Sequence, residues 1–218
     1  MERVSFWSET CFNTAMVAEV MEPVLEERAR RIIESTIELA EEGGFEAVRL
    51  RDVAARAEVA MGTLYRRFRS KEDLLVAALE LETRVLQERI RQRPPKGVDA
   101  GERAVQFFAI TTRGLLRRPN LSRAMLKAAA AGEPALASKV GVFHDMMLRM
   151  IVGALRGSFV ADNDESISKQ EKLVGDVLNQ IWFAVMVGWS GGLQTQTTIH
   201  ERMADAVGLV LGDSNPLA

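Results

Sequence analysis

The chain has 218 residues, a net charge of −2 at pH 7 and a hydrophobic fraction of 47%, which suits one large domain or two small ones. The sequence contains no run of eighteen apolar residues, and its opening Met-Glu-Arg lacks the pattern of a secretory signal, so we expect a cytoplasmic protein without a membrane span. The single cysteine, Cys11, excludes an internal disulfide and is typical of a reducing compartment.

The first part of the chain divides into an extension and a long helix. Residues 1–23 show no clear period, and we treat them as an uncertain N-terminal extension without an assigned function. From residue 24 to residue 43, apolar side chains recur at helical spacing opposite a face of Glu and Arg, which predicts the first long helix. Gly43 and Gly44 are expected to end it.

Residues 51–75 carry the pattern of a helix-turn-helix. Two short segments, residues 52–57 and 61–68, place apolar side chains at helical spacing, and a turn at residues 58–60 joins them. The second segment is polar at its exposed positions. Ser70 then stands where an N-cap would open the next helix.

The same stretch is basic, although the whole chain is slightly acidic. Between Arg49 and Lys71 there are seven basic and two acidic residues, a net charge of +5. Such a local basic face is the electrostatic footprint of a DNA-binding element. A short polar helix beginning at Met61 has the right size to enter a major groove. A charged surface on an ordinary helical domain is the alternative interpretation of the charge run alone.

The pattern DVAxxAxVxxGTLYxxFxSKEDLL over residues 52–75 resembles the signature of TetR-type repressors. The resemblance implies that the GTLY segment is the recognition helix, that Thr63 and Tyr65 contact phosphates or bases, and that Lys71 binds a phosphate. It also implies that Met61 and Arg67 face base edges. The residues assigned to DNA contact are Arg49, Arg51, Met61, Gly62, Thr63, Tyr65, Arg66, Arg67 and Lys71.

Three positions depart from that signature. Glu58 stands where the turn often has Gly, so we expect a non-glycine residue at positive φ there. Ala60 and Arg49 stand where Ser or Thr commonly caps the two short helices. Two roles stay open as well. The Tyr65 ring contacts either DNA or the core. Near the start of the first helix, Arg28, Arg30 and Arg31 contact either the DNA backbone or Glu26, Glu27 and Glu34.

The rest of the chain is expected to be helical, without strands. Residues 71–91 form a connecting helix that ends at the Arg-Pro-Pro-Lys-Gly segment beginning at Arg93. Further helices are expected near residues 99–117, 120–131, 134–157, 167–191 and 198–212. The predicted fold is all-α with about nine helices, a DNA-binding head at residues 24–75 and a ligand-binding and dimerisation body at residues 76–218.

Large apolar side chains gather on the body helices. Methionines and aromatic residues line adaptable apolar pockets, but they fill bundle cores at least as often. The TetR-type resemblance favours a pocket for a small-molecule effector. The low polar content of the pocket lining indicates that this effector is a bulky hydrophobic molecule. The candidate pocket residues are Phe107, Phe108, Met125, Phe143, Met146, Met147, Met150, Trp182, Met186 and Trp189.

The last two long helices are the expected dimer surface. Residues 167–191 are apolar on more than one side, so this helix packs on its own body and on a second chain. Met203, Val207 and Val210 of the final helix are expected to complete the same four-helix interface. Two-fold symmetry then predicts a palindromic operator with half-sites roughly 34–36 Å apart, or somewhat more for a wide dimer.

Within the family, the chain also resembles the KstR-type repressors of sterol catabolism. The similar segments are GGFEAV from Gly43, VAMGTLYRRF from Val59 and DVLNQIWFAVMVGW from Asp176. This resemblance implies a steroid-like or acyl-CoA-type effector. Arg113, Arg117 or Arg118 then holds an anionic end of the effector, or else serves a helix end.

Other signals do not support an enzyme. The GWSGG segment around Ser190 matches the G-x-S-x-G esterase pattern, but a long apolar helix precedes it and no acid lies between Ser190 and His200. His144 and His200 are the only histidines, too few for a metal site without further ligands. We therefore expect no cofactor and no metal.

Two functions remain open. The first is a ligand-responsive repressor that binds a palindromic operator as a homodimer. The second is a DNA-binding protein of the same fold that has no small-molecule inducer and acts through a protein partner or as an architectural factor.

Overall fold

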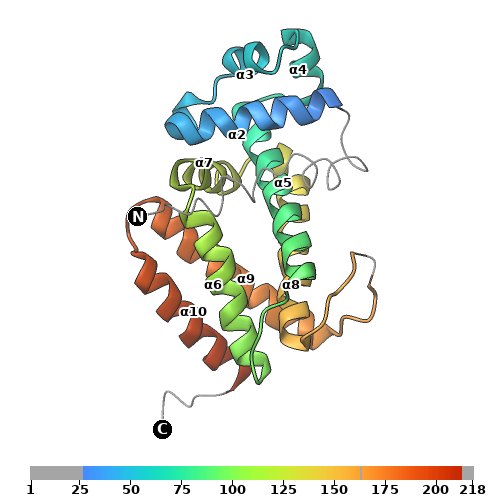
Figure 1. Cartoon of the computed structure of the whole chain (residues 1–218), viewed down its shortest axis with the longest axis vertical. Helices are drawn as coiled ribbons and strands as arrows, with labels where there is room; N and C mark the ends of the chain where they lie inside the picture. Colours follow the sequence, from blue (N-terminus) through green and yellow to red (C-terminus); the bar gives the residue numbers. More distant parts are fainter. Residues whose placement is uncertain (1–26, 163, 213–218) are drawn as a thin grey trace, which may run out of the picture.

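A computed structural model describes residues 27–162 and 164–212. In this part of the chain, all regular secondary structure is helical, and short loops join the helices (Figure 1). The expectations for residues 1–23 lie outside it. The head consists of α2 (Glu27–Ala47), α3 (Leu50–Arg56) and α4 (Met61–Arg67), and α5 (Lys71–Gln92) runs from it into the body. The body consists of α6 (Ala100–Leu116), α7 (Pro119–Ala129), a 3₁₀ turn (Pro134–Leu136), α8 (Ala137–Arg156), α9 (Lys169–Ser190) and α10 (Gln196–Leu211). The all-α prediction is confirmed.

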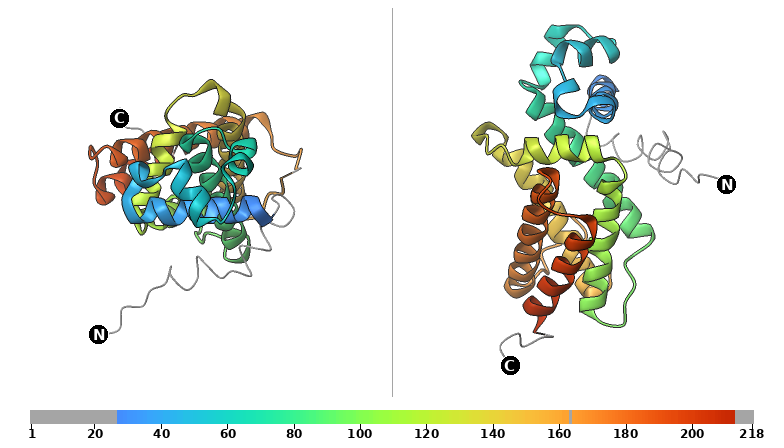
Figure 2. Two further views of the ribbon diagram at one scale, coloured as in Figure 1. Left: turned by 90° about the horizontal axis from the view of Figure 1, so that it is seen from above. Right: turned by 90° about the vertical axis from the view of Figure 1, so that its left-hand side faces the viewer.

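The head packs around the predicted apolar stripe of α2. Ile32, Ile33, Val53 and Leu64 are at most 1% exposed, and Phe68 closes this small core after α4. The three helices lie above α7, on which α2 packs, and α5 descends beside α7 and α8 (Figures 1 and 2). Helix α5 packs on α2 of the head and on α7 and α8 of the body, so it belongs to both parts.

The end of α2 differs from the expectation of a simple glycine stop. Gly43 has φ −145° and ψ 19°, Gly44 has φ 68° and ψ −157°, and a helical turn resumes after them as far as Ala47. The backbone region of Gly44 is essentially restricted to glycine. The pair therefore makes a kink rather than a terminus, and the kink directs Phe45 back toward α5 and α7, where Lys71 and Lys127 lie over its ring.

The predicted helix at residues 134–157 is also divided. A short 3₁₀ turn beginning at Pro134 precedes α8, which starts only at Ala137. Proline lacks a backbone N–H and fixes φ, so it suits the first turn better than a helix interior. One further close approach depends on glycine: a Cβ at Gly175 of α9 would collide with Leu148 of α8.

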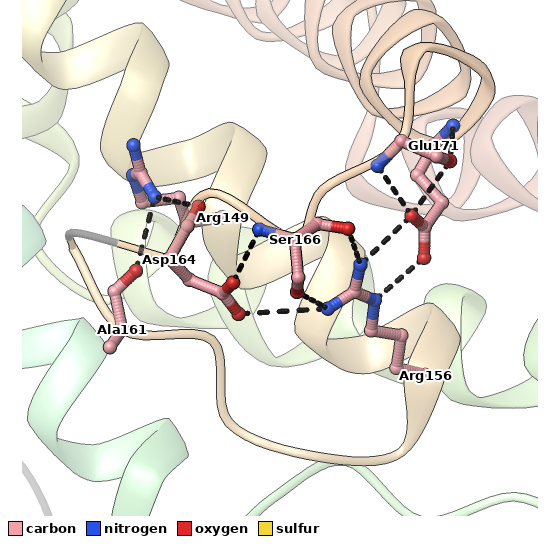
Figure 3. Close-up of polar contacts among 7 residues, drawn as sticks. Arg149, Arg156, Ala161, Asp164, Ser166 and Glu171 are labelled. Carbon is pink, nitrogen blue, oxygen red and sulfur yellow. Dashed lines mark hydrogen bonds and ion pairs between the residues drawn. The ribbon is translucent and has the colours of Figure 1, made fainter.

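A network of polar contacts holds the connection between α8 and α9 (Figure 3). Arg156 forms two hydrogen bonds to Glu171, at 2.6 and 2.8 Å, and a further one to the Ser166 carbonyl. Glu171 also accepts from the Ser168 backbone N–H at 2.9 Å, completing a capping box. These hydrogen bonds lower the pKa of Glu171 to about 2. The bonds from Arg156 have the largest effect, followed by those from Ser168.

Acid should weaken this connection. Because the folded pKa of Glu171 lies below its ordinary value of 4.5, its contribution to stability is present above about pH 4.5 and is lost as the pH falls toward 2. The site is exposed, so we expect Glu171→Gln to lower Tm by only about 1–3 °C at pH 7. Thermal melts should show that difference shrinking toward pH 2. A Glu165→Gln control in the same connection should leave the Tm unchanged, and a pH-independent deficit in Glu171→Gln would contradict the assignment.

Candidate DNA-binding and effector sites

Helix α4 presents its polar residues outward from a single buried anchor. Leu64 is completely buried, whereas Gly62, Tyr65, Arg66 and Arg67 are exposed. Tyr65 is 54% exposed, so its ring does not lean on the core. Leu64 therefore anchors α4 to the head core, and the exposed side chains lie on the opposite, solvent-facing side of the helix.

The turn before α4 has the predicted strain. Glu58 is the only described non-glycine residue at positive φ, with φ 53°. Neither Arg49 nor Ala60 makes a side-chain capping hydrogen bond to the helix it precedes. By contrast, Ser70 caps α5 as predicted, accepting from the Asp73 backbone N–H at 3.1 Å. The connection into the body is thus better capped than the recognition segment.

Arg28 joins the surface of α4. With Thr63, Arg66 and Arg67 it lines an open hollow of about 400 Å³, and Arg66 donates to the Thr63 hydroxyl at 3.3 Å. Its neighbour Arg30 instead pairs with glutamates of its own helix. Arg30 therefore has glutamate partners, whereas a DNA contact by Arg28 stays a prediction.

The other assigned residues lie at or near the starts of α3, α4 and α5. Arg49 and Arg51 are exposed at the start of α3, and Met61 is half-buried at the start of α4. Lys71 opens α5, with Nζ at 3.3 Å from Glu46 Oε2 and 3.9 Å from the centre of the Phe45 ring. A phosphate contact by Lys71 therefore has to compete with Glu46, which a sequence pattern does not reveal.

The body holds a central cavity of about 50 Å³, lined from five helices, α5 to α9. Of the predicted pocket residues, Met125, Phe143, Met147 and Trp182 line it. The remaining lining residues are Leu79, Glu82, Thr83, Leu86, Thr111, Gly114, Leu115, Arg118, Leu121, Ser122 and Leu126. The walls are mainly apolar, as expected. At the polar edge, Arg118 is one of the three arginines considered from the sequence, whereas Glu82 was not predicted.

The other predicted pocket residues lie elsewhere. Phe108 lines a second cavity, of about 160 Å³, between α6 and α10. Met150 lines a third, of about 70 Å³, between α5 and α8. Four more are buried and line none of these three cavities: Phe107, Met146, Met186 and Trp189. In this conformation they pack as core.

The polar edge of the central cavity is an ion pair. Arg118 Nη1 lies 2.8 Å from Glu82 Oε1, and its Nε contacts Glu41 of α2. Burial raises the pKa of Glu82, while the positive charge of Arg118 acts in the opposite direction. Among the three arginines considered for an anionic effector, Arg118 lies at the central cavity and Arg113 lines the α6–α10 cavity.

Comparison with known proteins decides the family. A model of bacterial regulatory proteins of the tetR family matches residues 32–78, and one of the tetracyclin repressor-like C-terminal domain matches residues 97–210, more than half of the chain. The chain belongs to the TetR family. The resemblance drawn from the helix-turn-helix signature is thereby confirmed.

Relatives in the TetR family extend over most of the chain. It is 35% identical over 191 residues to the HTH-type transcriptional repressor KstR of Rhodococcus jostii (strain RHA1), which covers 87% of this chain and 85% of the relative. It is 30% identical over 189 residues to KstR of Mycobacterium tuberculosis (strain ATCC 25618 / H37Rv), covering 87% and 83%. The resemblance to KstR-type repressors is therefore also confirmed.

Solved structures of TetR-family regulators share the fold. A TetR transcriptional regulator from Rhodococcus sp. RHA1 matches with a TM-score of 0.75 and 27% identity, covering 86% of this chain and 97% of that one. Thermus thermophilus FadR in complex with lauroyl-CoA matches with a TM-score of 0.68 and 19% identity, covering 87% and 98%. The arrangement of head, connecting helix and body is thus the family's arrangement.

The surface expected to pair two TetR-family chains is partly apolar. Leu173 and Val177 of α9 are 58% and 37% exposed, and Leu209 of α10 is 52% exposed. The assignment of Met203 and Val207 to this surface was wrong: both are 1% exposed. They are buried because α10 packs on α6 and α9 of its own chain.

The signals set aside from the sequence have structural roles. Ser190 is the last residue of α9, so a helix and not a strand leads to it, and its hydroxyl donates to the Val187 carbonyl at 2.7 Å. His144 is half-buried with Nδ1 at 3.0 Å from the Asn179 amide, and burial lowers its pKa. Within residues 27–162 and 164–212, no three His, Cys, Asp or Glu side chains gather as metal ligands would, and no helix has the length and hydropathy to cross a bilayer.

Proposed function

We propose that this TetR-family chain is a ligand-responsive transcriptional repressor that acts in the cytoplasm as a homodimer on a palindromic operator and is released by a hydrophobic effector. One observation carries the proposal. Helix α5 begins beside the exposed recognition helix and, further along, lines the apolar cavity of the body. Whatever fills that cavity therefore acts on the element that positions the head.

The DNA contacts follow from the exposure of α4. Its exposed face enters the major groove, where Tyr65 and Arg67 reach base edges or phosphates, and Thr63 and Arg66 contact the backbone. Arg28 extends the same surface across α2, so of its two possible roles we propose the contact to a phosphate of the DNA backbone. Two such heads, related by the dimer axis, bind half-sites roughly 34–36 Å apart or somewhat further.

The cavity's size supports a coupled mechanism. Sites for drug-sized ligands usually measure about 300–1,000 Å³, whereas the central cavity measures about 50 Å³. A large effector must therefore push apart the helices that line it, α5 included. The structure then represents a conformation that the effector disfavours, which is the requirement for ligand-driven release.

The comparisons support an acyl-CoA-type or steroid-like effector. Curated relatives are KstR repressors, and two similar structures, the FadR proteins of Thermus thermophilus and Bacillus subtilis, are complexes with lauroyl-CoA and stearoyl-CoA. Both ligand types contain a long apolar part, an acyl chain or a steroid skeleton, which fits a cavity whose walls are apolar except at one edge.

Ligand titration tests this proposal. We expect lauroyl-CoA, stearoyl-CoA or cholesterol to raise Tm by about 5–10 °C at a hundredfold excess over Kd. The same ligand should weaken operator binding about 5- to 150-fold. Thermal melts and gel shifts on the same samples measure both effects.

A filled cavity provides the control. Leu126→Trp replaces an aliphatic side chain of the cavity wall with a large indole ring and should abolish the Tm shift. Val98→Trp, at a site that is 92% exposed, should preserve the Tm shift. Circular dichroism checks that both variants stay helical. If all three ligands leave both Tm and operator affinity unchanged, the second function, DNA binding without a small-molecule inducer, replaces the first.

A further inference from the structure

The central cavity offers few polar atoms to a ligand. Thr83, Thr111 and Ser122 line it, but each hydroxyl donates to the carbonyl oxygen of an earlier residue, at 2.7, 2.9 and 2.7 Å. Their protons are therefore already engaged. The charged residues among the described lining side chains are Glu82 and Arg118. A carbonyl or carboxylate of an effector therefore finds its hydrogen-bond donor at Arg118.

Arg118 also connects the body to the head. Its side chain is 10% exposed and lies between Glu82 of α5 and Glu41 of α2, contacting both carboxylates. Beside it, the Asn120 amide donates to the Glu41 carbonyl at 3.0 Å. We call Arg118, Glu41 and Glu82 the Arg118 clasp. It is the point at which the cavity, the connecting helix and the head meet.

Two other contacts follow the same charge pattern, and in each the cation is more exposed than Arg118: 59% for Lys127 and 39% for Lys139. Lys127 of α7 lies 3.3 Å from Glu46, and Lys139 of α8 lies 2.5 Å from Asp73 at the start of α5. The body therefore presents cations and the lower side of the head presents carboxylates. Exposed pairs such as Lys127–Glu46 contribute little, whereas breaking a buried pair is strongly unfavourable. The Arg118 clasp should dominate this interface.

We propose that Arg118 is the residue that couples effector binding to the head: a carbonyl or carboxylate of the effector competes for its guanidinium and so releases Glu41. This rests on the proposed function, because it specifies how the same cavity signals. Once Glu41 loses its partner, α2 is free to shift on α7, and the two recognition helices leave the spacing of successive grooves. Burial raises the pKa of Glu82 and the positive charge of Arg118 lowers it, so loss of the Arg118 contact raises this pKa further.

The first experiment needs no ligand. Hydrogen exchange is measured on Glu41→Gln, Arg118→Gln and the double variant, with Arg202→Gln on the exposed face of α10 as the matched control. We expect each single variant to speed exchange in the second half of α2 and the start of α7 by about threefold or more. The double variant should exceed the larger single effect little, because both changes break one contact. Unchanged exchange in the single variants, or fully additive effects in the double variant, would show that the Arg118–Glu41 contact does not hold α2 on α7.

The second experiment uses lauroyl-CoA and its thioether analogue S-dodecyl-CoA, which lacks the carbonyl. In the wild-type protein both should raise Tm, but lauroyl-CoA should weaken operator binding several-fold more. Glu41→Gln should keep the Tm shift and lose most of the weakening, whereas Arg118→Gln should respond to the two compounds alike, without the extra weakening by lauroyl-CoA. Equal release by the two compounds, or full release in Glu41→Gln, refutes coupling through Arg118. If neither compound affects the wild type, the effector assignment fails, and the hydrogen-exchange result still decides the clasp.

Discussion

Replacing Tyr65 with alanine is expected to weaken operator binding by about 1–3 kcal/mol, a factor of roughly 5 to 150. The Tyr65 side chain is 54% exposed on α4 and makes no contribution to the head core, whose anchor in this helix is Leu64. The loss should therefore appear in DNA affinity and not in folding. Fluorescence anisotropy with a labelled operator gives the affinity, and a thermal melt of the same variant should change by less than about 1 °C.

Arg66 supplies the comparison for Tyr65. As a phosphate contact, its replacement by alanine should weaken binding to all duplexes similarly and reduce the salt slope by about 0.9. Arg202→Ala on α10 should change neither property. Normal operator affinity in both Tyr65→Ala and Arg66→Ala would show that α4 does not face the DNA.

The second large effect is expected at the surface of α9. Leu173 and Val177 stand one helical turn apart and expose apolar side chains that the body of the same chain does not cover. Glutamates at both positions would place like charges across a two-fold axis, and we expect the double variant to be monomeric at micromolar concentration. Because a dimer gains avidity from its second half-site, operator affinity should fall by about 100-fold or more.

Sedimentation measures the dimer directly. Val98→Glu, at an exposed position between α5 and α6, is the matched control and should remain dimeric. Thermal unfolding should retain one transition in all variants. A double variant that stays dimeric would place the partner on another surface, and a wild-type protein that is monomeric would remove the palindrome from the proposal.

Local sequence rules predicted the elements of the head because each depends on neighbouring residues. The Ser70 cap, the apolar stripe of α2 and the positive φ of Glu58 all appear as expected. The glycine kink at Gly44 was interpreted as a stop because a pattern of residue types does not show whether helical geometry resumes afterwards. The 3₁₀ turn at Pro134 was missed for the same reason.

The effector cavity was only partly predictable because its walls come from five helices. Composition identified Met125, Phe143, Met147 and Trp182, but the same composition also selected residues that pack as core, such as Phe107 and Met186. Arg118 was one of three arginines considered. Its partners Glu82 and Glu41 lie 36 and 77 residues away along the chain, and no local periodicity reports such a contact.

The most direct test of the repressor proposal is selection of duplexes from a random pool by the purified protein, followed by titration of the selected site with and without lauroyl-CoA. If the proposal is correct, the selected site is two-fold symmetric and is bound by two chains, and its affinity falls about 5- to 150-fold when the ligand is present. Equal affinity for the selected site and for random duplex would contradict it.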